Sequence, residues 1–152
     1  MDTSNRMTLD EFRILHSTVI EHYQFIESHL EETYAALSGK PFLDGLADVE
    51  KHNISRLIKD LKTVQSSKGM IVFTDDEFER INRICERRNF WVHNCYYDLV
   101  FNTEKKGAGP KYESDIKQLK TDIHDAESLR NELFIKKNEL IDQLDHKALF
   151  GF

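Results

Sequence analysis

The sequence predicts an all-α protein: an up-and-down bundle of four to five helices with a long C-terminal helix. Apolar residues recur at spacings of three and four over long stretches, as the buried face of a helix requires. Proline and glycine, two and six among the 152 residues, fall mainly where these stretches are interrupted. The length fits one domain, 1–152, that can bury a core without disulfides or metal.

The first helix is expected over residues 9–37. Thr8 and Glu11 form a capping box at its start, and Gly39 provides a stop at its end. One apolar stripe runs along the whole segment, formed by Leu9, Phe12, Leu15, Val19, Tyr23, Ile26, Leu30, Tyr34 and Leu37.

A second helix is predicted over residues 47–65, with an apolar stripe that runs from Ile54 to Val64. The stretch "SSKG" at 66–69 marks its end. The short apolar run "MIVF" at 70–73 is too brief for a sheet, and we expect it to pack as a connecting segment.

The third helix is predicted over residues 74–102, with Thr74 and Glu77 as a second capping box. Arg88 interrupts its main apolar stripe. A second apolar face lies nearly opposite, so the helix is either central in the bundle or meets a partner there, such as a second copy across a twofold axis near His93. The main stripe comprises Phe78, Ile81, Cys85, Val92, Cys95 and Leu99, and the second face Phe90, Tyr97 and Phe101.

The last helix is predicted over residues 112–144, after a flexible loop at 103–111. Arg130 and Lys137 occupy positions on its apolar stripe, which fits an outer helix or a partial coiled coil. Tails are expected at 1–7 and 145–152, and the aromatic rings of the second tail could dock on the bundle. The stripe comprises Ile116, Leu119, Ile123, Ala126, Leu133, Leu140 and Leu144.

Composition narrows the class of protein. The net charge of −6 argues against a broad nucleic-acid surface but leaves room for a small basic cleft. Cys85 and Cys95 lie ten residues apart on one predicted helix, too far to pair, which indicates reduced thiols and a cytoplasmic protein. No apolar run has the length of a signal peptide core or a membrane span.

The third helix carries the residues that point to chemistry. A charged side chain in an apolar run is costly unless it is compensated, and "RNFWVH" places Arg88, Asn89 and His93 in such a run. This motif resembles the signature of the HEPN superfamily (higher eukaryotes and prokaryotes nucleotide-binding domain): arginine, often a polar residue, a short mostly apolar run, and histidine. The resemblance covers six residues and the helical layout.

The resemblance implies a metal-independent endoribonuclease without a cofactor, of a kind found in toxin–antitoxin and phage-defence systems. Two motifs would meet across a homodimer, through the third helix, in one composite cleft. His93 would act on the 2′-hydroxyl or the leaving 5′-oxygen, because the pKa of histidine suits proton transfer near neutral pH. Arg88 would bind the phosphate, and Asn89 would orient the histidine or the phosphate.

Arg87 and Tyr97 are further candidates for binding RNA. Arg87 belongs to a stripe with Arg80 and Arg83 that could follow an RNA backbone, or could form a solvated face with ion pairs. Tyr97 is one turn from His93. We assign Trp91 to the core, and no spacing of residues indicates a metal site.

Other interpretations remain open. The chain could be a catalytically inactive bundle that binds a nucleotide or a nucleotidyltransferase antitoxin, or a helical scaffold. Arg88 could be a core arginine paired with Glu86 or with a glutamate of another helix. On an ideal helix Arg88 and His93 point about 140° apart, so their convergence needs a curled arginine or a local kink. Some toxins of the family carry a modified tyrosine two residues after the histidine, where this chain has Cys95.

Overall fold

The computed structural model describes residues 7–94, 109–144 and 149–150. These residues form an all-helical bundle and contain no strand, as the sequence predicts. In chain order the elements are α1 (Leu9–Leu37), α2 (Phe42–Val49), α3 (Ile54–Lys68), α4 (Asp75–Asn89), a π-helix (Phe90–Asn94) and α5 (Gly109–Gln143). None of the described helices is both long and apolar enough to cross a membrane.

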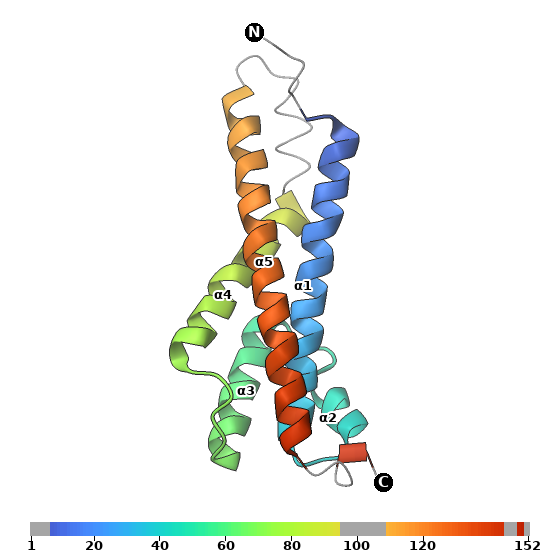
Figure 1. Ribbon diagram of the computed structural model, residues 1–152, viewed down its shortest axis with the longest axis vertical. Coiled ribbons are helices and arrows are strands. Elements are labelled where there is room, and N and C mark those ends of the chain that lie inside the picture. Colours follow the sequence, from blue (N-terminus) through green and yellow to red (C-terminus); the bar gives the residue numbers. More distant parts are fainter. Residues whose placement is uncertain (1–6, 95–108, 145–148, 151–152) are drawn as a thin grey trace.

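The two long helices, α1 and α5, lie side by side along the bundle and run in the same direction (Figure 1). Two ion pairs show the parallel direction. Oε1 of Glu21 lies 3.6 Å from Nη1 of Arg130, and further along both helices Oε2 of Glu32 lies 2.7 Å from Nζ of Lys137. Helix α2 covers the end of α1, α3 runs in the same direction as α1, and α4 returns in the opposite direction along the other side (Figure 1).

The prediction of α1 is confirmed at both ends. The Thr8 hydroxyl accepts from the backbone N–H of Glu11 at 3.1 Å, and the Glu11 carboxylate accepts from the N–H of Thr8 at 2.8 Å. Gly39 follows the helix with a φ of 75°, which glycine adopts without strain. The predicted stripe is buried or half-buried except Leu9, which is 45% exposed in the first turn.

The single helix predicted over 47–65 is wrong, because two helices occupy this region. Asn53 caps α3, and its side chain accepts from the backbone N–H of Arg56 at 2.9 Å. Gly45 allows α2 to pack closely on α1, since a Cβ there would lie 2.8 Å from the Cα of Ala35. The asparagine side chain can bond to nearby backbone groups, which favours the start of a helix over its interior. Asn53 therefore begins a new helix within the segment that was predicted as one.

The segment at 70–73 packs as a connection between helices and not as a strand, as predicted. The Gln65 side chain holds it: the amide donates to the carbonyl of Phe73 at 3.0 Å and accepts from the N–H of Phe73 at 3.2 Å. The Phe73 ring is buried against that of Phe78. Thr74 then caps α4, and its hydroxyl accepts from the N–H of Glu77 at 3.2 Å.

Helix α5 begins at Gly109, so the loop predicted over 103–111 is wrong for its last three residues. Pro110 fits there because proline is tolerated in the first turn of a helix. Leu149 is buried, and the ring of Phe150 lies 5.7 Å from that of Phe42, so this part of the tail docks on α2. The remaining predicted loop and tail residues, 1–6, 103–108, 145–148 and 151–152, lie outside the described residues.

Candidate functional site

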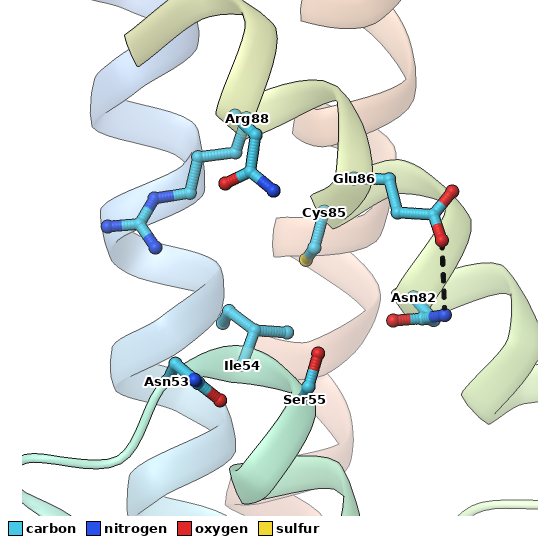
Figure 2. A pocket seen from close by; sticks show the side chains of 8 residues that line it. Asn53, Ile54, Ser55, Asn82, Cys85, Glu86 and Arg88 are labelled. Carbon is cyan, nitrogen blue, oxygen red and sulfur yellow. Dashed lines mark hydrogen bonds between the residues drawn. The ribbon is translucent and has the colours of Figure 1, made fainter. Parts of the chain in front are cut away.

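Arg88 lies in the last turn of α4 and extends toward α1 (Figure 2). Its Nη2 atom is 3.6 Å from Oε2 of Glu27, with side chains 34% and 25% exposed. This distance is that of an ion pair and too long for a hydrogen bond. In the described part of the chain the Arg88 guanidinium therefore has an acidic neighbour but no hydrogen bond.

Glu27 is the glutamate that the core-arginine interpretation of Arg88 anticipated, and it belongs to another helix. The second suggested partner, Glu86, instead accepts a long hydrogen bond of 3.5 Å from the Asn82 amide on α4. The Glu86 side chain is exposed, whereas Glu27 is partly covered by the contact between α1 and α4.

A pocket of about 160 Å³ lies beside Arg88, where the start of α3 faces α4. Its lining is polar apart from Ile54 and Cys85, whose side chains point into the gap between the two helices (Figure 2). The structure thus brings two of the three predicted catalytic residues, Arg88 and Asn89, to one pocket. The lining residues are Asn53, Ile54, Ser55, Asn82, Cys85, Glu86, Arg88 and Asn89.

His93 lies in the π-helix that follows α4, and its side chain is exposed. The sequence predicts a regular α-helix here with Val92 on the buried stripe, and this is wrong: Val92 is 47% exposed and Trp91 is fully buried. Hydrogen bonds in a π-helix join residues five apart, so the turn is wider and the buried face shifts by one position. The placement of Trp91 in the core is confirmed.

The π-helix also changes the relation between Arg88 and His93. Because its bonds join residues five apart, it reduces the angle of about 140° that an α-helix would place between them. The Arg88 side chain extends to α1, and the His93 side chain is exposed to solvent. Within the described part of the chain, no hydrogen bond joins Arg88 to His93.

A buried carboxylate, which the sequence analysis missed, fixes the π-helix. Oδ2 of Asp122 on α5 accepts from the Trp91 indole N–H at 2.7 Å and from Nε of Arg87 at 2.9 Å. The Trp91 carbonyl oxygen also lies 2.6 Å from Nε2 of His16 on α1. An aspartate between the stripe residues Leu119 and Ala126 was the available signal.

The two predicted RNA-binding residues have different outcomes. Arg87 is 39% exposed, pairs with Asp122, and places its guanidinium 5.1 Å from the centre of the Phe90 ring. These contacts give it a structural role, and its contact with RNA stays a prediction. Tyr97 lies outside the described residues. Elsewhere on the arginine stripe, Arg80 forms an ion pair with Glu132 of α5, and Arg83 is exposed.

The described residues offer neither an activated thiol nor a metal site. Burial raises the pKa of Cys85 to about 12, although the Arg88 cation acts in the opposite direction, so the thiol stays protonated near neutral pH. Within the described ranges, no three His, Cys, Asp or Glu side chains are grouped so as to hold a metal ion.

Comparison with known proteins identifies no relative of this chain. No protein-family model, curated protein or solved structure matches this chain. A functional interpretation therefore rests on the chain's own residues and on the geometry of the site around Arg88.

Proposed function

We propose that the chain is a metal-independent endoribonuclease of the HEPN type that acts in a toxin or phage-defence system. The observation that carries the proposal is the state of Arg88. The Arg88 side chain lines a pocket and is about one-third exposed, and its guanidinium makes no hydrogen bond within the described residues. Its N–H donors match the oxygens of a phosphate, with which arginine forms short charge-assisted hydrogen bonds.

The proposed reaction is a transfer within the RNA strand. A ribose 2′-oxygen attacks the adjacent phosphorus, the bond from phosphorus to the 5′-oxygen breaks, and the products are a 2′,3′-cyclic phosphate and a 5′-hydroxyl. His93 takes the proton of the 2′-hydroxyl or gives one to the 5′-oxygen. Arg88 stabilises the charge on the phosphoryl oxygens in the transition state, and Asn89 orients the phosphate or the imidazole.

A homodimer completes the site in this proposal. His93 is exposed, as is Val92 beside it, and the sequence predicts a second copy near this histidine. Pairing of two copies there would cover the Val92 side chain. It would also bring the histidine of one copy toward the arginine of the other, which supplies the pairing that no hydrogen bond provides within one chain.

A binding module is the second candidate, and the contact between Arg88 and Glu27 favours it. A carboxylate 3.6 Å from the guanidinium competes with a phosphate for the same donors. In this alternative the ion pair is structural, and the bundle binds a nucleotide or a nucleotidyltransferase partner without cleaving RNA.

The test is RNA cleavage in EDTA by purified wild type, His93→Ala and Arg88→Ala, with molecular mass from size-exclusion chromatography with light scattering. We expect both variants to lose about 100-fold or more of the activity while they keep the wild-type mass. The product ends should be 2′,3′-cyclic phosphates, identified by mass spectrometry.

Matched controls come from exposed residues of the same type. Arg13→Ala removes an exposed arginine of α1, and His124→Ala removes an exposed histidine of α5. Both should cleave like the wild type. A folded wild-type protein that leaves a varied RNA pool intact would refute the enzyme and favour the binding module.

A further inference from the structure

We propose that the pocket between the start of α3 and the end of α4 binds one guanine base of a single-stranded RNA. This inference rests on the proposed function, because it assigns the base that lies next to the phosphate held by Arg88. It identifies Glu86, Asn82 and the first residues of α3 as the part of the site that determines sequence preference.

The size of the pocket fits one base. Its volume of about 160 Å³ is well below the roughly 300 Å³ at which pockets for drug-sized ligands begin. Ile54 and Cys85 provide an apolar floor between the two helices (Figure 2). A planar ring placed on this floor would keep its edges directed at polar side chains on both sides.

The charges in the pocket favour a base over a second phosphate. Arg88 brings one positive charge, but Glu86 lines the same pocket and Glu27 lies 3.6 Å from the guanidinium. A phosphate wholly inside the pocket would meet the Glu86 carboxylate as a like charge. A neutral ring with both donors and acceptors on its edge meets no such repulsion.

Among the four bases, guanine matches these side chains best. A carboxylate only accepts hydrogen bonds, and guanine alone presents two adjacent donors, N1–H and the N2 amino group. Adenine would place its N1 acceptor against Glu86. On its other edge guanine presents the acceptors O6 and N7, which can accept from the side-chain donors at the start of α3 while Arg88 holds the phosphate. The Glu86 side chain extends away from Arg88 and toward Asn82 (Figure 2), which separates the carboxylate from the guanidinium that holds the phosphate.

The first residues of α3 supply further polar groups. The Ser55 hydroxyl points toward α4 across the pocket (Figure 2). The side-chain Oδ1 atom of Asn53 accepts from the backbone N–H of Arg56 at 2.9 Å, which leaves the N–H groups of the same side-chain amide as donors at the rim. Asn82 donates to Glu86 at 3.5 Å and so helps to hold the carboxylate at the pocket.

The test uses fluorescently labelled, short 2′-O-methyl oligouridines, which lack the attacking hydroxyl and cannot be cleaved. One central position carries guanine, hypoxanthine or adenine, and fluorescence anisotropy gives the dissociation constants. We expect guanine to bind about tenfold more tightly than adenine, with hypoxanthine between them because it lacks the N2 amino group. Glu86→Gln should remove most of this preference.

The matched control is Glu79→Gln, which changes an exposed glutamate of the same helix outside the pocket and should keep the full preference. Circular dichroism confirms that each variant is folded. Equal affinity for all three bases in the wild type, or a preference that Glu86→Gln leaves intact, would overturn the base pocket.

A parallel cleavage assay on unmodified RNA separates the two proposals. Cleavage without preference for guanine retains the ribonuclease and refutes the base pocket. Preference for guanine without cleavage retains the pocket and refutes the ribonuclease. Absence of both binding and cleavage refutes both.

Discussion

The indole N–H of Trp91 donates to the carboxylate of Asp122 at 2.7 Å, and this bond joins the π-helix to α5. The same oxygen accepts from Arg87, and the other oxygen accepts from the Gln118 amide at 2.8 Å. One buried carboxylate therefore satisfies donors from α4, the π-helix and α5. The position of His93, two residues after Trp91, depends on this contact.

Asp122→Ala should lower the free energy of unfolding by about 3 kcal/mol, because it leaves the buried Trp91 donor without its partner and removes the counter-charge of Arg87. Urea denaturation followed by tryptophan fluorescence measures the change. Asp125→Ala, at an exposed position on α5, should shift the midpoint little. Equal stability of the two variants would contradict the role of Asp122.

Tyr23→Phe should leave the stability unchanged or raise it by up to about 1 kcal/mol. The Tyr23 side chain is buried, and its hydroxyl has no hydrogen-bond partner among the described residues. Phenylalanine fills the same space without the cost of desolvating that hydroxyl. Thermal and urea unfolding of both proteins check this prediction, and a loss above about 1 kcal/mol would indicate a partner for the hydroxyl.

His29→Phe should reduce the loss of stability on acidification. Burial lowers the pKa of His29 from its ordinary value of 6.5, and the Lys137 cation, with Nζ 3.5 Å from Nδ1, lowers it further. Below pH 6.5 His29 therefore binds a proton more readily in the unfolded chain than in the folded chain. The free energy of unfolding falls as the pH falls through this value. The other groups that face the ring are Glu32, Arg130, Phe25 and Phe134.

Urea unfolding at a series of pH values between about 7.5 and 5.5 measures this effect. The variant should retain part of the wild-type slope, because burial and the Arg130 cation also lower the pKa of His22. His124→Gln, which changes an exposed histidine of α5, serves as the control and should keep the wild-type slope. Identical slopes in His29→Phe and the wild type would exclude the contribution of His29.

Glu27→Gln should tighten the binding of uncleavable RNA by about threefold at low salt, since it removes the carboxylate that competes with a phosphate for Arg88. The effect is small because both side chains are partly exposed to solvent. Glu31→Gln, one turn further along α1, is the matched control and should bind like the wild type. Weaker binding by Glu27→Gln would mean that Glu27 positions Arg88 for its ligand and does not compete with it.

Much of the fold could be predicted from local patterns. Thr8 and Thr74 mark helix starts because a hydroxyl satisfies backbone N–H groups that a helix leaves unpaired, and the structure has both caps. The second predicted helix failed at Asn53: its apolar stripe begins only at Ile54, and the predicted start at residue 47 lies before the residue that caps a new helix. Helix periodicity reports burial, but it cannot exclude a short break within a segment.

The site was predictable only in part. The pattern of residues indicated that Arg88 needs a partner, but the choice of Glu27 depends on how α4 crosses α1. The exposure of Val92 and the burial of Trp91 follow from the π-helix, which no spacing rule signals. The pocket likewise arises where α3 approaches α4, and the sequence does not predict how these two helices lie relative to each other.

The parallel pairing of α1 with α5 has a consequence for biosynthesis. The most extensive interface in the bundle joins helices that lie at opposite ends of the described chain. On the ribosome, α1 emerges long before the surface that covers its apolar stripe, so this interface closes only after α2, α3 and α4 have been made. The nascent chain must keep that stripe from aggregating until then, and a prematurely terminated product would expose it permanently.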